Sequence, residues 1–274
     1  MSDSTVDPTS DAASSGPAES GSLRTLERGL LVLELLAQSN SGLTFSEVRE
    51  RVGLSAGTVS RLLQTLVKRG YVEQDRRSKA YLLGLQLLEL QGSTLASNRM
   101  ASEARPHLLE LMRATGCRVH LAVYRGGDHL VYVDRVDNQQ SIARYSPVAR
   151  GGPLHATSLG KAILAFSTPE VRSEYLAISK RQKLTPATLT DAAALNAEFE
   201  EIRSRGYATE FGESDVDIYC VGAPVRDYTG AVIAAVSVAG DRDEMAPRVE
   251  ELAELVRATA TKVSSAFGYR ESAY

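Results

Sequence analysis

The stretch GLSAGTVSRLLQTLVKRGYVEQD, residues 53–75, decides the fold of the N-terminal part of the chain. Ser55 is a typical helix N-cap, and Gly70 stands where a helix of this length would end. Between them, apolar residues recur at helical spacing and predict one buried face: Val59, Leu62, Leu63, Leu66 and Val67. The opposite face carries hydrogen-bonding and basic side chains without an acid: Thr58, Arg61, Gln64, Thr65 and Lys68. A solvated helix face usually mixes both signs of charge, so this one favours an anionic partner.

Two further helices are predicted before this stretch. Ser22 can cap a leucine-rich helix that residues 40–42 (Asn-Ser-Gly) terminate. Thr44 and Glu47 have the spacing of a capping box, which opens a short helix over residues 45–52.

A short β-hairpin is predicted after the stretch, from residues 71–73 and 80–82 around the polar turn 75–78. Helix, short helix, glycine turn, amphipathic helix and hairpin make a winged helix-turn-helix. In that module the last helix enters the DNA major groove. The alternative is a buried three-helix unit whose polar faces are merely solvated.

Charge separates this module from the rest of the chain. The net charge of the 274 residues is −3, which gives no indication of nucleic acid. Residues 22–85, however, hold ten Lys/Arg and six Asp/Glu, whereas residues 1–21 hold four acids and no base. A basic module beside an acidic tail is typical of a nucleic-acid-binding domain.

The residues predicted to contact DNA lie on the helix of the quoted stretch and in the hairpin turn. Arg61 is the candidate for a base edge, and Gly57 allows close approach of the backbone. Arg76, Arg77 and Lys79 are predicted to hold phosphates. The full predicted set is Ser55, Gly57, Thr58, Ser60, Arg61, Gln64, Thr65, Lys68, Arg76, Arg77 and Lys79.

The rest of the chain predicts a second, larger domain. A linker helix over residues 85–99 leads into a helix at 101–115. Alternating segments at 118–124 and 129–136 form one hairpin, and segments at 217–225 and 231–239 form another. Helices are predicted at 157–166, 169–178, 192–205 and 247–267, with a further strand at 142–145. Hairpins interspersed with helices predict an α+β domain, an antiparallel sheet covered by helices.

Three motifs of this domain resemble catalytic or metal-binding sites but lack the full pattern of such sites. GGPLHATSLGKA lacks the spacing of a phosphate loop, because His155 stands where the first glycine belongs. Ser158 and Lys161 match the S-x-x-K pair of serine amidases without its partner motifs. Four scattered histidines, with Cys117 and Cys220 as the two cysteines, predict no metal site and reduced thiols. A helix start with free N–H groups can instead bind a carboxylate.

The combined pattern resembles the IclR family of bacterial transcriptional regulators over residues 22–268. The stretches that carry the resemblance are LRTLERGLLVLELL (23–36), residues 53–70, YLLGL (81–85), VYVDRV (131–136), PLHATSLGKAILA (153–165), RGY (205–207), YCVGAPV (219–225) and Ser237.

The resemblance implies a winged helix-turn-helix joined by a linker helix to a GAF-like effector-binding domain. It also implies a homodimer or dimer of dimers on palindromic or repeated operators. The effector would be a small-molecule carboxylate, held by residues that match the family positions: Ser158, Leu159, Glu210, Cys220 and Ser237. Ala239 replaces a second family serine and Ser158 a glycine, which favours a larger or less polar acid, an aromatic one included.

The sequence therefore predicts a disordered tail (1–21), a DNA-binding domain (22–84), a linker helix (85–99), an effector-binding domain (100–268) and a short tail (269–274). The leading function is a ligand-responsive transcriptional regulator without catalytic residues, metal or cofactor. No signal peptide or membrane span is found, which predicts a cytoplasmic protein. The alternatives are an enzyme with a DNA-binding appendage, using Ser158/Lys161 or Cys220, and an architectural DNA binder without a ligand.

Overall fold

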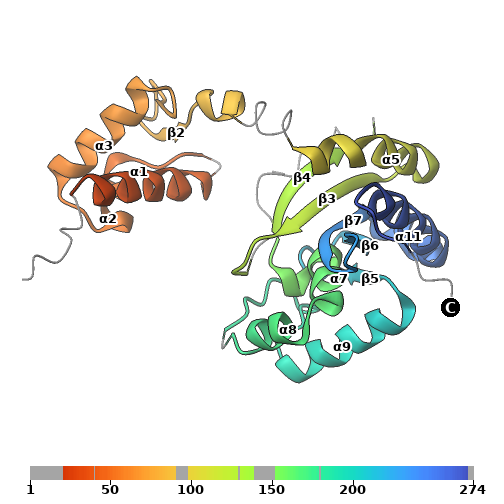
Figure 1. The fold of residues 1–274 in the computed structure, drawn as a ribbon. Coiled ribbons are helices and arrows are strands. Elements are labelled where there is room, and N and C mark those ends of the chain that lie inside the picture. Colours follow the sequence, from red (N-terminus) through yellow and green to blue (C-terminus); the bar gives the residue numbers. More distant parts are fainter. Residues whose placement is uncertain are drawn as a thin grey trace, which may run out of the picture. The chain divides into compact units, whose positions relative to one another are not determined.

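The computed structural model describes residues 21–39, 41–90, 98–128, 130–138, 152–178 and 180–270. The chain forms two compact units, residues 1–94 and 95–274, and each is described by itself (Figure 1). Residues 1–20 of the tail predicted for 1–21, the strand predicted at 142–145 and residues 271–274 lie outside the described residues, whereas Gly21 belongs to the first helix.

The first unit is the predicted winged helix-turn-helix. Its core consists of apolar residues from all three helices and the hairpin, among them Val32, Val48, Val59, Leu63 and Val72. The elements are α1 (Gly21–Ala37), α2 (Phe45–Val52), α3 (Ala56–Lys68), β1 (Val72–Gln74) and β2 (Tyr81–Leu83).

The sequence anticipated the boundaries of α2 and α3, because both helices begin at side-chain caps. Thr44 and Glu47 form the predicted capping box of α2, and Gly53 ends the helix with φ 63°. Two details differ. Ser22, which was predicted to precede the first helix, lies within α1, Gly21–Ala37. Val67 is 40% exposed, so the apolar face of α3 ends at the half-buried Leu66, one residue earlier than predicted.

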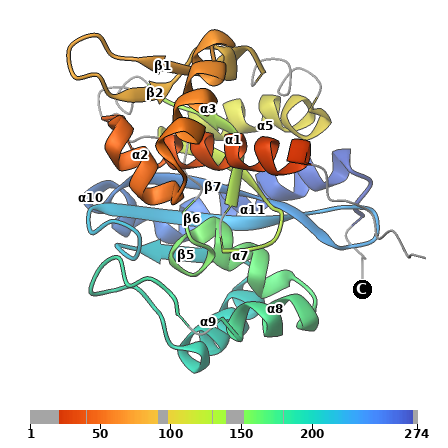
Figure 2. The same ribbon diagram turned by 90° about the vertical axis from the view of Figure 1, so that its left-hand side faces the viewer.

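The second unit is built on a five-stranded antiparallel sheet with the order β4-β3-β7-β6-β5. The helices α5 and α11 pack on one face of the sheet, and α7 packs on the other with α8 and α9 behind it (Figure 2). The strands are β3 (Arg118–Tyr124), β4 (Leu130–Val136), β5 (Ala208–Phe211), β6 (Ile218–Arg226) and β7 (Val232–Asp241). The longer helices are α5 (Arg99–Thr115), α7 (Ser158–Phe166), α8 (Pro169–Leu176), α9 (Ala192–Arg205) and α11 (Val249–Ala266).

Both hairpins of this unit were predicted, but β5 and the start of α5 were not. Residues 86–90 are helical, and Asn98 caps α5 with hydrogen bonds from the N–H groups of Met100 and Ala101. Arg99 therefore opens α5, and Asn98 before it is not helical, whereas residues 91–97 of the linker helix predicted for 85–99 lie outside the described residues. Short elements, η1 (Leu154–Ala156), α10 (Arg242–Met245) and η2 (Ala246–Arg248), complete the unit.

None of the described helices is long and apolar enough to cross a membrane. In the same described segments, no group of three or more His, Cys, Asp or Glu side chains is arranged to hold a metal ion.

Candidate functional site

Hydrogen bonds at both ends fix α3 in place. The side chain of Ser55 accepts the backbone N–H of Thr58 at 3.4 Å, and the two hydroxyls lie 2.9 Å apart. At the other end Arg69 is the cap residue, and Gly70 follows with φ 76°. A residue in this left-handed conformation is usually glycine, which ends the helix and turns the chain into β1.

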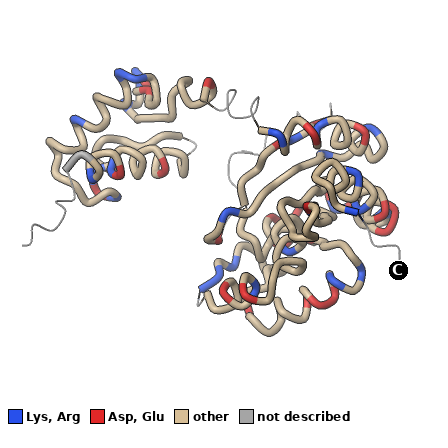
Figure 3. The backbone as a smooth tube through the Cα atoms, viewed as in Figure 1, with Lys and Arg blue, Asp and Glu red and all other residues tan. Residues whose placement is uncertain are grey.

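The outer face of α3 is exposed and carries no acidic side chain (Figure 3). Arg61, Gln64, Thr65 and Lys68 are exposed, as are Ser55 and Gly57, whereas Thr58 and Ser60 are half-buried. Side chains on this face bond back to the helix: the Arg61 Nε donates to the Gly57 carbonyl at 3.3 Å and the Thr65 hydroxyl to the Arg61 carbonyl at 2.8 Å. The face is therefore ordered and rich in donors, as contact with base edges and phosphates requires.

The hairpin turn is organised by Asp75. Its Oδ1 accepts the backbone N–H groups of Arg77 and Ser78 at 3.0 and 2.6 Å and the Ser78 hydroxyl at 2.7 Å. The backbone and hydroxyl bonds from Ser78 hold the pKa of Asp75 below its usual range. The turn ends at Lys79 with φ 59°. This arrangement leaves the predicted phosphate ligands Arg76, Arg77 and Lys79 exposed.

The residues of the predicted effector site converge on the α7 face of the sheet. Cys220 on β6 is directly opposite Glu210 on β5, and Gly222 on β6 is opposite Ser237 on β7. Helix α7 begins directly above Gly222, because a Cβ added there would lie 3.1 Å from backbone atoms of Ser158. Strand pairing thus brings together residues that are far apart in the sequence.

The start of α7 offers backbone donors at this place. Thr157 caps the helix by accepting the N–H of Gly160 at 3.1 Å. The N–H groups of Ser158 and Leu159, in the first turn, have no acceptor within the helix. The side chain of Leu159 is buried in the apolar core on the α7 side of the sheet, which leaves its backbone N–H as the group a ligand could contact.

Burial favours the protonated, neutral forms of Glu210 and Cys220. Burial raises the pKa of Glu210, although hydrogen bonds from Cys220 and Ser214 act in the opposite direction. Glu210 Oε1 accepts the backbone N–H and the hydroxyl of Ser214 at 3.0 and 2.8 Å. Burial and the adjacent Glu210 raise the pKa of Cys220 well above its ordinary value, so the group is a thiol. A protonated thiol is a poor nucleophile.

Lys161 is buried and bound to carboxylates. Its Nζ lies 2.5 Å from Glu213 and 3.5 Å from Glu198, and its side chain is 2% exposed. An amine paired in this way does not serve as the base that the S-x-x-K interpretation requires for Ser158. The arrangement of Lys161 and Cys220 therefore disfavours the enzymatic alternative.

His155 belongs to a buried hydrogen-bond network. Its Nδ1 lies 3.0 Å from the Tyr175 hydroxyl and its Nε2 lies 2.9 Å from the Gln182 carbonyl oxygen. The Tyr175 hydroxyl donates to Asp128 at 2.7 Å. This buried network anchors η1, which precedes α7, and positions the start of that helix.

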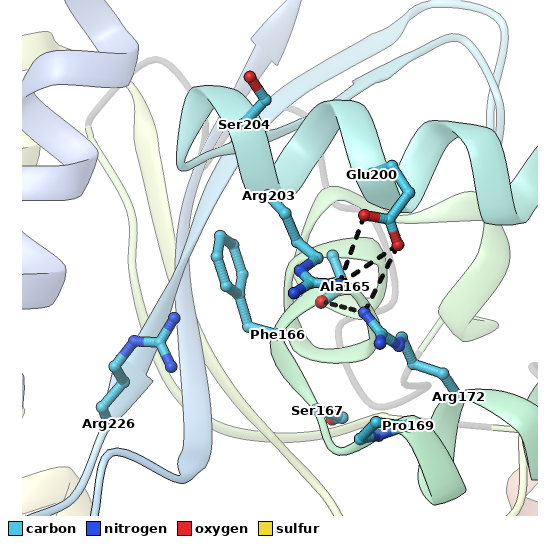
Figure 4. A pocket seen from close by; sticks show the side chains of 9 residues that line it. All are labelled: Ala165, Phe166, Ser167, Pro169, Arg172, Glu200, Arg203, Ser204 and Arg226. Carbon is cyan, nitrogen blue, oxygen red and sulfur yellow. Dashed lines mark hydrogen bonds and ion pairs between the residues drawn. The ribbon is translucent and has the colours of Figure 1, made fainter.

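A cavity of about 640 Å³ lies at the opposite, C-terminal end of α7 (Figure 4). Its arginines have partners within the protein: Arg172 donates to the Ala165 carbonyl at 3.1 Å, and Arg203 donates to Glu200 at 3.2 Å. The Arg226 guanidinium lies 4.8 Å from the centre of the Phe166 ring. Among the predicted effector residues, none lines this cavity, which is therefore separate from the predicted site.

Two residues on the α7 face were missed by the sequence analysis. His120 on β3 is opposite Ser237, and the ring of Tyr132 on β4 lies 5.2 Å from the His120 ring. The alternating pattern of residues 118–124 places His120 on one face of the sheet, but it does not say which face.

A winged helix-turn-helix followed by a sheet domain with a buried polar site is the architecture of a transcriptional regulator. Residues 25–76 match the IclR helix-turn-helix domain, and residues 92–265 match the family described as bacterial transcriptional regulator IclR C-terminal. This chain belongs to the IclR family of bacterial transcriptional regulators.

Curated relatives and solved structures agree with this assignment. The chain is 32% identical to the HTH-type transcriptional regulator BhcR of Paracoccus denitrificans, over 97% of this chain and 95% of BhcR. The crystal structure of Thermotoga maritima IclR matches with a TM-score of 0.68 and 31% identity, covering 90% of this chain and all of that one. An IclR homologue from Microbacterium hydrocarbonoxydans, crystallised with 4-hydroxybenzoate, matches with a TM-score of 0.72 and 27% identity, covering 89% of this chain and 99% of that one.

Proposed function

We propose that this regulator binds double-stranded operator DNA through α3 and the hairpin turn, and that a small organic acid at the start of α7 changes its operator affinity. The observation that carries the DNA-binding part is the exposed, acid-free face of α3 beside the basic turn. The residues are the eleven predicted from the sequence, with Arg61 on a base edge and Arg77 on a phosphate.

The proposed effector site consists of the first turn of α7, Glu210, Cys220 and Ser237. The N–H groups of Ser158 and Leu159 would hold the carboxylate, which is favourable at a helix N-terminus. Ser237 is 2% exposed and lies beside the helix start, where its hydroxyl can donate to the same acid. The 4-hydroxybenzoate bound to the Microbacterium homologue supports an aromatic acid as one candidate.

A second copy of the chain is the proposed partner, in a homodimer or a dimer of dimers. Four leucines of α1 are 46–61% exposed: Leu23, Leu26, Leu30 and Leu31. Exposed apolar side chains that recur along one helix favour association with another chain. Two linked modules would bind two operator half-sites, palindromic or repeated. We expect the protein to act on the bacterial chromosome, in the cytoplasm, and not as an enzyme.

Effector control requires that the acid bind the DNA-competent and the incompetent arrangement with different affinity. Footprinting on the DNA upstream of the protein's own gene, with and without candidate acids, tests the whole proposal. We expect a protected region that includes two half-sites and whose protection changes with one of the acids. Protection that no acid alters would support the ligand-free architectural binder instead.

Calorimetric titration of the full-length protein with the active acid tests the site itself. Ser237→Ala and Glu210→Ala are each expected to weaken acid binding about threefold to tenfold, the effect of one hydrogen bond. Operator affinity without the acid should stay near that of the wild type. If both variants bind the acid as tightly as the wild type does, the effector site has been placed wrongly.

A further inference from the structure

Several polar groups on the α7 face of the sheet lack protein partners. Within the described part of the chain, the ring nitrogens of His120 and the hydroxyls of Tyr132 and Ser237 make no hydrogen bond. Ser237 is almost fully buried, and His120 and Tyr132 are half-buried. Polar groups that lie close together without a protein partner are available to hydrogen-bond a bound molecule.

The position of Tyr132 extends this group of residues across the sheet. Tyr132 is on β4, yet burial and the nearby charges of Cys220 and Glu210 together raise the pKa of its hydroxyl to about 12. Its ring packs against His120, which pairs with Ser237 on β7. His120, Tyr132 and Ser237 are therefore neighbours on the face of the sheet on which α7 begins.

Glu210 has less capacity than His120 and Tyr132 to bind a second polar group of the ligand, because one of its oxygens is already occupied. Its Oε1 accepts two hydrogen bonds from Ser214, from the backbone N–H and from the hydroxyl. A hydroxyl on the ligand would compete with these donors. The unsatisfied groups of His120 and Tyr132 have no such competition.

His120 has the protonation state that this role requires. Burial, together with the cations Arg118 and Arg135, lowers the pKa of His120 to about 3, against which Asp137 acts weakly. Asp137 binds both arginines, at 2.9 Å from the Arg118 Nε and 2.6 Å from the Arg135 guanidinium. The imidazole is therefore neutral near pH 7, and one ring nitrogen accepts a hydrogen bond while the other donates.

We infer that His120 and Tyr132 are specificity-determining residues of the effector site, which select an acid that also carries a hydroxyl group. The acid would lie at the first turn of α7 beside Ser237, and its hydroxyl would donate to His120 and accept from Tyr132. This inference rests on the proposed effector site. It identifies the ligand class as hydroxylated carboxylic acids, in preference to the matching acids without the hydroxyl.

Calorimetry on the full-length protein with matched pairs of acids tests this specificity. The probes are 4-hydroxybenzoate with benzoate, and lactate with propionate. We expect the wild type to bind the hydroxylated member of at least one pair about tenfold or more tightly, because an unfilled polar site rejects the analogue. His120→Phe and Tyr132→Phe, which keep a ring in place, should each reduce this preference to threefold or less.

Two controls separate specificity from folding. His120→Gln retains a donor and an acceptor and should restore most of the preference. Tyr124→Phe alters a tyrosine of the neighbouring strand β3, whose hydroxyl already donates to the Gly127 carbonyl at 3.3 Å. This variant should leave the preference unchanged. The melting temperature of each variant shows whether it is folded.

The outcomes distinguish this inference from the proposed function. If Ser237→Ala weakens binding of both members of a pair but His120→Phe and Tyr132→Phe keep the wild-type preference, the effector site stands and the present inference is wrong. Equal binding of both members of each pair by the wild type also overturns it. Binding of none of the four acids contradicts the proposed site and, with it, the role of His120 and Tyr132.

Discussion

Helices α3 and α7 begin with similar side-chain caps, but α3 is mostly exposed and α7 is almost entirely buried. Ser55 caps the first and Thr157 the second, each by accepting a backbone N–H from three residues further on. In α3 three of 13 residues are buried, whereas α7 buries eight of nine. We propose that a capped helix start serves a large external anion in α3 and a small enclosed one in α7. The surrounding packing decides between them, because it determines what can reach the helix.

The largest expected effect concerns the buried charges of α7. In Lys161→Met the carboxylate of Glu213 would stay buried without its cation, which costs about 3–5 kcal/mol of unfolding free energy. Burial already raises the pKa of Glu213 despite the neighbouring Lys161. Denaturant unfolding of the second unit measures this loss.

Exposed charges on the same unit provide the control for Lys161→Met. Lys262 lies 3.2 Å from Glu110, with both side chains 57% exposed, and Lys262→Met should change stability by less than about 1 kcal/mol. The double variant Lys161→Met/Glu213→Gln should recover most of the loss. Equal losses of unfolding free energy in Lys161→Met and Lys262→Met would contradict the contrast between buried and exposed pairs.

Arg61→Ala tests the external surface of α3. If Arg61 binds a base edge through two hydrogen bonds, its removal should cost about 1–3 kcal/mol of operator affinity and relax selectivity at one position per half-site. Competition binding with operators changed at single positions measures both. Arg51→Ala removes the same charge from α2 and should leave selectivity unchanged. Arg61→Ala with wild-type affinity and selectivity would mean that the face is assigned wrongly.

Arg77→Ala is expected to act on every DNA sequence alike. Loss of one phosphate contact should reduce the slope of log affinity against log salt by about one unit, so the effect is roughly eightfold at 0.1 M salt and small near 1 M. Affinity measured over a range of salt concentrations gives the slope. Arg125→Ala, in an exposed turn of the second unit, should not alter it. A change confined to one operator sequence would instead place Arg77 on a base.

The two regions also differ in how far the sequence predicts them. Local signals define the DNA-binding module: Ser55 begins α3, Gly70 follows its end, and Thr44 with Glu47 opens α2, all as predicted. The proposed DNA ligands follow each other along one helix and one turn. The exposure of Arg61, Gln64, Thr65 and Lys68 could therefore be inferred from helical periodicity, and that of the turn residues from the polar turn itself.

The proposed effector site could not be derived in the same way. Its residues come from five strands, β3 to β7, and from α7. Strand pairing and the packing of α7 on the sheet bring them together. The strand that carries Glu210 has four residues and lacks a clear alternation, so it was not predicted. Family resemblance indicated Glu210, Cys220 and Ser237, but His120 and Tyr132 emerged only from the register of the sheet. The partners of Lys161 likewise depend on contacts across more than thirty residues of chain.

One glycine in each helix allows a direct comparison of α3 and α7, and its substitution has the smallest expected effect. A Cβ on Gly57 of α3 would have no atom within 4 Å, whereas one on Gly160 of α7 would lie 2.3 Å from the Leu154 carbonyl oxygen. Gly57 is thus not required by packing within this chain, although glycine in a helix interior costs roughly 0.5–1 kcal/mol relative to alanine. Close approach of a DNA backbone would explain its presence.

Gly57→Ala is therefore expected to stabilise the first unit by about 0.5–1 kcal/mol and at the same time to weaken operator binding. Thermal unfolding and operator titration of the same preparation measure the two effects. Gly29→Ala on α1, where a Cβ also meets nothing within 4 Å, should stabilise the unit similarly without weakening DNA binding. If Gly57→Ala raises stability and leaves operator affinity intact, the start of α3 does not approach the DNA as closely as proposed, and the contact must lie further along the helix, towards Arg61 and Lys68.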